Sequence, residues 1–246
     1  PFKCLKMINL GYSMNLTMTP DFGNSKLIER IFFEGCESLL NLHPSIRELT
    51  GLYILNLNEC TRLKELGEPI LKRKRSPQPM TQWASMWYLY LGHLSNLRRL
   101  PEQLGDMKGL KLFDANHTAI EELPDSITQL EGLYELELSN CKKLRKLPEE
   151  FGNMKGLSIF KACNTAISKL PDSFAGLINL VKLDLSCCKS LRSLPNDIWK
   201  LTLLEVLNLG QCSKLDRLPE QLGKMQCLEH LYASQPAIEE VSDSIE

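Results

Sequence analysis

The chain has no excess of charge of either sign and no long apolar run. Its 246 residues carry 29 basic and 30 acidic side chains, for a net charge of −1. A nucleic-acid-binding surface needs a basic face, so this balance argues against DNA or RNA as a partner. No apolar run approaches the roughly 20 residues of a membrane-spanning helix. We therefore expect neither nucleic-acid binding nor membrane insertion.

Motifs that carry chemistry are also missing. The sequence has no glycine-rich phosphate loop ending in Gly-Lys-Ser/Thr, and no arrangement of nucleophile, base and acid. None of the nine cysteines forms a C-x-x-C pair, so a zinc site has no support. We expect no catalytic activity, no cofactor and no metal in this chain.

What the sequence does have is a repeat of 23 to 24 residues. Residues 133–148 and 180–195 both read L-x-x-L-x-L-x-x-C-x-x-L-x-x-L-P, which is the pattern of a leucine-rich repeat. Ten units are registered by their first apolar residue, and one interval, between units three and four, is about ten residues too long. These first residues are Leu5, Ile28, Leu52, Met86, Leu110, Leu133, Leu157, Leu180, Leu204 and Leu228.

The pattern predicts an α/β solenoid. In each unit the L-x-x-L-x-L stretch alternates like a short strand with its leucines inward, Leu136 and Leu183 among them. Stacked parallel strands form a concave sheet. The L-P segment then returns along the convex side, where the proline suits the first position of a short helix or 3₁₀ turn. Acidic residues that follow the proline favour the start of that turn.

One place in the repeat, eight residues after the first apolar residue, holds small side chains. Thr118 and Thr165 occupy it in two units. Five other units have a cysteine there: Cys36, Cys60, Cys141, Cys188 and Cys212. A recurring position of this kind indicates a buried column of thiols in place of a disulfide framework. We therefore expect a reducing, intracellular environment.

The repeats make residues 1–246 one leucine-rich-repeat domain, interrupted by an inserted loop at about residues 67–82. Prolines and charges fill that interval, including the basic run Lys72–Arg75. The run is either a solvated insertion, a contact for an acidic partner or a nuclear address. The chain ends inside a unit and neither end carries a distinct polar cap, so we expect a fragment of a larger protein.

The first 60 residues resemble one family in particular. Residues 5–10 read L-K-M-I-N-L, and they are followed by T-P-D-F at 19–22, E-G-C at 34–36, H-P-S-I at 43–46 and L-N-L-x-x-C at 55–60. This succession, with the later T-A-I-x-x-L-P units, resembles the repeats of plant intracellular TIR-type nucleotide-binding leucine-rich-repeat disease resistance proteins.

The resemblance implies a role in plant defence. In that family the repeats recognise a pathogen effector or a guarded host protein and hold the nucleotide-binding domain in check by an intramolecular contact. It implies a cytoplasmic location, with the nucleus as an alternative. Two other interpretations stay open: a cytosolic scaffold that binds a small GTPase or another signalling protein, and the substrate-recruiting arm of a ubiquitin ligase.

The candidate binding residues lie on the predicted concave face. Unit four reads M-W-Y-L-Y-L, which exposes Trp87, Tyr88 and Tyr90 together, and Tyr53 and Phe32 come just before them on neighbouring strands. Exposed aromatic groups of this kind are typical of binding hot spots. The alternatives are that the insertion covers them, or that they are tolerated surface residues.

Two histidines complete the candidate site. His93 and His117 hold the same place in successive units, so we expect them to lie about one strand spacing, ~4.8 Å, apart. A metal-binding pair is conceivable, but we expect no carboxylate or cysteine in register with them. We assign both to the protein-binding face.

Overall fold

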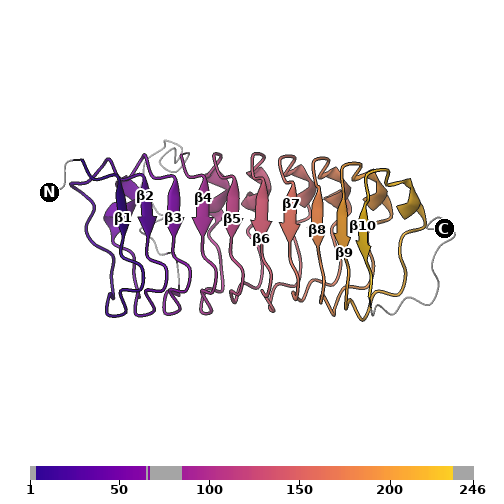
Figure 1. The fold of residues 1–246 in the computed structure, drawn as a ribbon, viewed down its shortest axis with the longest axis horizontal. Coiled ribbons are helices and arrows are strands. Elements are labelled where there is room, and N and C mark those ends of the chain that lie inside the picture. Colours follow the sequence, from indigo (N-terminus) through magenta and orange to yellow (C-terminus); the bar gives the residue numbers. More distant parts are fainter. Residues whose placement is uncertain (1–3, 65, 67–84, 235–246) are drawn as a thin grey trace.

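Ten short parallel strands form a single open sheet. The strands follow one another across the sheet in chain order, as Figure 1 shows. The computed structural model describes residues 4–64, 66 and 85–234. Each strand has three residues and begins two residues after the first apolar residue of its unit. The strands are β1 (Met7–Asn9), β2 (Arg30–Phe32), β3 (Ile54–Asn56), β4 (Tyr88–Tyr90), β5 (Leu112–Asp114), β6 (Glu135–Glu137), β7 (Ile159–Lys161), β8 (Lys182–Asp184), β9 (Val206–Asn208) and β10 (His230–Tyr232). The predicted solenoid and its repeat register are confirmed.

Adjacent strands pair so that equivalent positions of successive repeats lie side by side. Leu136, for example, pairs with Phe113 on one side and Phe160 on the other. The middle residue of every strand from β2 to β9 is buried, including Leu136 and Leu183. The residues on either side of it face out of the concave surface. Every repeat thus adds one layer to a continuous core.

The convex side carries 3₁₀ helices, which Figure 1 shows behind the sheet. They are η1 (Pro44–Glu48), η3 (Glu102–Asp106), η4 (Asp125–Gln129), η5 (Phe151–Asn153), η6 (Asp172–Gly176), η7 (Asn196–Lys200) and η8 (Glu220–Lys224). An acidic residue stands in the first turn of five of them, as expected: η3, η4, η6, η7 and η8. The predicted short turn of the convex side is confirmed as a 3₁₀ helix.

The predicted place of the proline is wrong by one residue in most repeats. Pro101, for example, is the cap that precedes η3, with φ −81° and ψ 150°. Its carbonyl accepts a 3.0 Å hydrogen bond from the Leu104 amide. The cause is the i to i+3 bonding of a 3₁₀ helix: an extended proline supplies the first acceptor and still needs no donor. Only in η1 does the proline, Pro44, stand at the first helical position among the described helices.

On the convex side, the 3₁₀ helices of neighbouring repeats pack closely against one another. Gly152 of unit six faces Ser173 of unit seven, whose hydroxyl accepts from the Gly152 amide at 3.1 Å and donates to the Glu149 carbonyl at 2.5 Å. Gly105 and Ser126 also face each other between units four and five, where the Ser126 hydroxyl donates to the Glu102 carbonyl. A side chain on either glycine would overlap the backbone carbonyl of its facing serine.

Gly152→Ala is therefore expected to lower the free energy of unfolding by roughly 1–3 kcal/mol, because the new methyl group forces η5 and η6 apart. Urea unfolding followed by circular dichroism measures the change. Gly51→Ala is the matched control, since nothing lies within 4 Å of the Cβ added there. Equal stability of the two variants would contradict the close packing of these helices.

Some predicted features fall outside the described residues: the insertion at about 67–82, the Lys72–Arg75 run, and the partial unit at the end of the chain. In the part that is described, no helix combines the length and the apolar character that crossing a membrane requires.

Candidate functional site

The concave face carries its exposed side chains in rows that run across the strands. One row is formed by the first residues of the strands and a second by the third residues, on either side of the buried middle position. A further row is formed by the residues just before the strands, where Trp87 follows Tyr53 and donates its amide to the Tyr53 carbonyl at 3.0 Å. Aromatic side chains meet in all three rows at β4.

The aromatic patch consists of Tyr53, Trp87, Tyr88 and Tyr90. The Trp87 side chain is 51% exposed, and its ring centroid lies 5.8 Å from that of Tyr53 at a tilt of 50°. Tyr88 and Tyr90 are the two outward residues of β4 and are half-buried. Leu112, which the sequence reading missed, pairs with Tyr88 and extends the patch onto β5. The sequence could have indicated this, because Leu112 is the first strand residue of unit five, as Tyr88 is of unit four.

Phe32 is set apart from this patch. It pairs with Asn56 on β3, and Asn56 in turn pairs with Tyr90, so an amide lies between the two aromatic rings. Tyr53 therefore contacts the aromatic residues of unit four as predicted, whereas Phe32 lies one strand further away.

Carboxylates border the patch on the C-terminal side. The acidic flank consists of Asp114, which pairs with Tyr90, and of Glu135 and Glu137 on β6. Lys161 lies 2.8 Å from Glu135 and 3.5 Å from Glu137. Burial is the main reason why the pKa of the Asp114 carboxyl is raised. Burial, with Tyr88, Asp114 and Glu135 nearby, also raises the pKa of the Tyr90 hydroxyl.

The polar residues at the ends of the strands have a structural role that the sequence reading missed. The Asp114 carboxylate accepts a 2.9 Å hydrogen bond from the amide two residues later, that of Asn116. Asp184 accepts in the same way from Ser186 at 2.9 Å. Asn9, Asn56, Glu137 and Asn208 make the equivalent bond in their own repeats. The sequence could have indicated this role, because Asp, Asn or Glu recurs as the third residue of the strand, and such side chains close local turns.

The predicted column of small buried side chains is confirmed. All five cysteines of the column are fully buried, and each thiol donates to a backbone carbonyl of the preceding repeat at 3.1 to 3.2 Å. Thr118 and Thr165 donate instead to a carbonyl of their own repeat and contact the next cysteine sulfur at 3.2 Å. The nine cysteines are free thiols.

Burial raises the pKa of the Cys60 and Cys212 thiols to about 12, from an ordinary value of 9.0. At pH 8.5 both are expected to resist iodoacetamide in the folded protein, whereas the exposed Cys4 and Cys227 react. Because the folded pKa is the higher one, these thiols stabilise the fold fully below pH 9 and lose that contribution as the pH rises towards 12. Peptide mass spectrometry measures the labelling, and rapid alkylation of Cys60 would contradict the buried column.

The two histidines stack as expected. The ring centroids of His93 and His117 lie 4.2 Å apart at an interplanar angle of 10°. The His117 Nε2 is also 3.0 Å from the Asn140 side-chain amide. Burial, followed by the charges of His93 and Lys142, lowers the pKa of His117. A neutral His117 ring is therefore favoured in this stack.

The histidines belong to a column of left-handed backbone at the edge of the sheet. Eight residues at the same place in their repeats have φ between 53° and 63°: Tyr12, Glu59, His93, His117, Asn140, Asn164, Cys187 and Gln211. Glu59 holds this place in the repeat before His93, so the expectation that no carboxylate lies in register with the histidines was wrong. Within the described ranges, however, no three His, Cys, Asp or Glu side chains are grouped so that they could hold a metal ion. The stack is a feature of the edge beside the aromatic patch.

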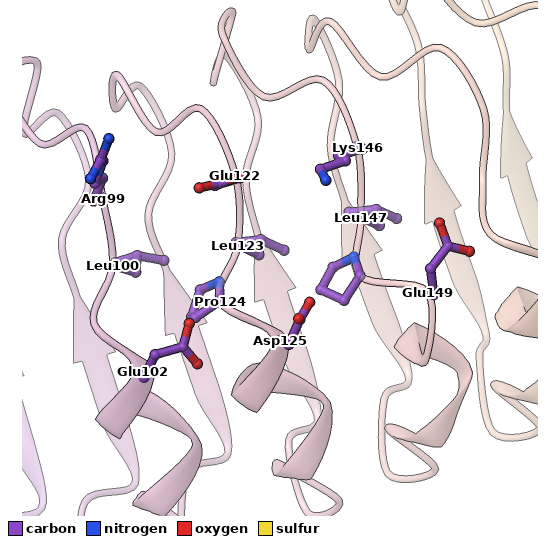
Figure 2. Close-up of a pocket in the computed structure, with 11 residues that line it drawn as sticks. Arg99, Leu100, Glu102, Glu122, Leu123, Pro124, Asp125, Lys146, Leu147 and Glu149 are labelled. Atoms are coloured by element: carbon purple, nitrogen blue, oxygen red, sulfur yellow. The ribbon is translucent and has the colours of Figure 1, made fainter.

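A groove also lies where the chain turns from the L-x-x-L-P segments into η3, η4 and η5 (Figure 2). Its volume is about 460 Å³, and Arg99, Glu122 and Lys146 line one side of it in a row of alternating charge. A similar groove of about 550 Å³ recurs at later repeats, beside Lys169 and Arg217. Since the groove recurs with the L-P segment, it is a general feature of the solenoid.

Comparison with known proteins agrees with this geometry. The model of a leucine-rich repeat region matches residues 31–162 and 134–246. The chain belongs to the leucine-rich repeat family. As a leucine-rich repeat domain it is 31% identical, over 120 residues, to TMV resistance protein N of Nicotiana glutinosa. That match covers 49% of the chain and 9% of the relative.

Other relatives are also plant disease resistance proteins. Disease resistance protein RPP4 of Arabidopsis thaliana is 29% identical over 123 residues, covering 50% of the chain and 10% of that protein. Disease resistance protein RUN1 of Vitis rotundifolia is 43% identical over 42 residues, or 17% of the chain and 3% of that protein. The resemblance to plant disease resistance proteins is thus confirmed. The chain spans about a tenth or less of the length of these relatives.

Solved structures support the fold. The Leptospira interrogans LRR protein LIC12759 superposes with a TM-score of 0.79 at 26% identity, over 97% of the chain and 57% of that protein. The leucine-rich repeat domain of the type III effector XopL gives a TM-score of 0.74 at 24% identity, over 90% and 73%. Both are leucine-rich repeat solenoids, and the second likeness concerns the fold alone.

Proposed function

We propose that this chain is the ligand-recognition and autoinhibitory domain of a plant intracellular immune receptor. It binds a pathogen effector or a guarded host protein. The observation that carries the proposal is the aromatic patch on the concave face, where Trp87 is half exposed on a rigid parallel sheet. Partly exposed tyrosine and tryptophan side chains on a rigid surface are the usual anchors of a protein interface. Similarity to plant disease resistance proteins supplies the context of defence.

The proposal includes the organisation of the parent protein. Residues 1–246 form one repeat domain, which contacts a nucleotide-binding domain of the same polypeptide in the resting state and resides in the cytoplasm. The domain acts by binding and the chemistry belongs to other parts of the parent. Solenoids suit this division because they offer a long concave surface without needing a catalytic centre.

Sequencing of the full transcript that encodes these repeats tests the proposal. We expect a nucleotide-binding module with a glycine-rich phosphate loop ahead of the repeats, and a TIR region ahead of that. When the repeat domain and the nucleotide-binding module are co-expressed as separate chains, the two should then co-purify. A transcript that encodes only repeats would contradict the proposal and favour a free-standing scaffold. An F-box or a catalytic-cysteine domain would instead favour a ubiquitin ligase.

A further inference from the structure

The charges around the aromatic patch are arranged unevenly. Asp114 lies beside Tyr90 on the neighbouring strand, and Glu135 and Glu137 lie one strand further. On the other side of the patch, the Glu34 carboxylate accepts a 3.3 Å hydrogen bond from the side-chain amide of Asn56, which pairs with Tyr90. The chain as a whole is nearly neutral, with a net charge of −1. Carboxylates therefore border the patch on both sides of an otherwise balanced molecule.

The two lysines on the C-terminal side of the patch, Lys161 and Lys111, are already engaged. Lys161 is held between Glu135 and Glu137. Lys111, next to Trp87 in its row, donates its ammonium group to the Gly132 carbonyl at 3.3 Å. Within residues 4–64, 66 and 85–234, no lysine or arginine forms an ion pair with Asp114, whose carboxylate accepts hydrogen bonds from the backbone and side-chain amides of Asn116. Asp114 thus offers an uncompensated carboxylate directly beside an aromatic surface.

Aromatic faces next to a carboxylate are suited to a cationic side chain. A guanidinium group stacks on tryptophan and tyrosine rings through their electron-rich faces, and it forms paired hydrogen bonds with a carboxylate. Desolvation by the patch strengthens both contacts because it lowers the local dielectric. A neutral or acidic partner would instead leave Asp114 buried without compensation, which costs binding energy.

We propose that the aromatic patch and Asp114 together receive a basic segment of the protein partner, with an arginine stacked on Trp87 or Tyr90 and paired with Asp114. This inference rests on the proposed function, because it specifies the partner chemistry of the same surface. It also specifies a role for Asp114 beyond the closing of its own turn.

The repeat itself provides the variant that separates these two roles. Asparagine stands at the Asp114 position in units one, three and nine, and there it accepts the same backbone hydrogen bond. Asp114→Asn therefore keeps the turn and removes only the charge. Asp184→Asn is the matched control, since Asp184 closes the same turn three strands away from Asp114 and outside the patch.

The test is selection of a random twelve-residue phage-display library on the immobilised chain, followed by fluorescence-polarisation titration of the selected peptides. We expect the peptides to be enriched in arginine and lysine. Asp114→Asn should weaken them roughly tenfold, Trp87→Ala should do so at least as strongly, and Asp184→Asn should leave them unchanged. Binding should also weaken as salt is raised.

The other outcomes distinguish the two proposals. Peptides that need Trp87 and Tyr90, but are neutral or acidic and indifferent to Asp114→Asn, would overturn the basic-segment inference and leave the binding surface intact. Peptides that bind regardless of Trp87→Ala, or no enrichment at all, would contradict the patch as a recognition surface and the inference with it.

Discussion

Replacing Trp87 and Tyr90 together by alanine is expected to abolish partner binding, with a loss of affinity of roughly a hundredfold or more. Both side chains project from the concave face at β4, Trp87 with half of its surface exposed and Tyr90 half-buried beside Asp114. Truncating such anchors removes large, preorganised contact area and lets water into the centre of the interface. Neither side chain belongs to the buried core, so the fold should persist.

Yeast two-hybrid scoring of an effector library, followed by titration of the purified pair, measures this loss. Ile178→Ala is a suitable control, because Ile178 is 52% exposed on the loop before β8, away from the patch. Tyr134→Ala provides a graded comparison, since Tyr134 is equally exposed and lies in the Trp87 row two strands away. A double variant with a native circular-dichroism spectrum and unchanged binding would refute the patch as the site of recognition.

Phe160→Ala should cause the largest loss of stability among single core truncations, roughly 3–5 kcal/mol. The Phe160 ring lies 5.2 Å from that of Phe151 and 6.2 Å from that of Phe174, and all three rings are fully buried. The three rings link β7 to the convex helices η5 and η6, so the cavity left by alanine would lie between sheet and helices.

Urea unfolding monitored by circular dichroism measures the Phe160→Ala effect. Ile178→Ala serves again as the control, because an exposed truncation is expected to change the free energy of unfolding by less than about 0.5 kcal/mol. A cost below about 1 kcal/mol for Phe160→Ala would show that the aromatic cluster does not hold the two faces together.

The fold could be predicted from the sequence because the same pattern of apolar residues recurs in unit after unit. Leu136 and Leu183 stand at the same place in their units, and a period of two around each marks a strand with one buried residue at its centre. The proline position was wrong for a physical reason. The L-P pattern alone does not reveal whether the proline starts the helix or supplies its first acceptor, which depends on the 3₁₀ hydrogen bonding.

The candidate site was predictable in part. Adjacent aromatic residues in one strand placed Trp87, Tyr88 and Tyr90 on the concave face, and equal repeat positions placed His93 beside His117. Contacts across the strands were harder to predict. Asn56 separates Phe32 from Tyr90, and Lys161 bridges two glutamates of the neighbouring strand. Such relations depend on which side chains meet between repeats, which a pattern within one repeat does not contain.

Hydrogen–deuterium exchange of the domain, alone and saturated with its protein partner, tests the concave aromatic surface most directly. Bound partner should slow exchange in residues 85–92 and 110–116, the segments that carry β4 and β5, and leave the convex helices η3 to η8 unchanged. Protection confined to the convex helices, with no change at β4 and β5, would contradict the account.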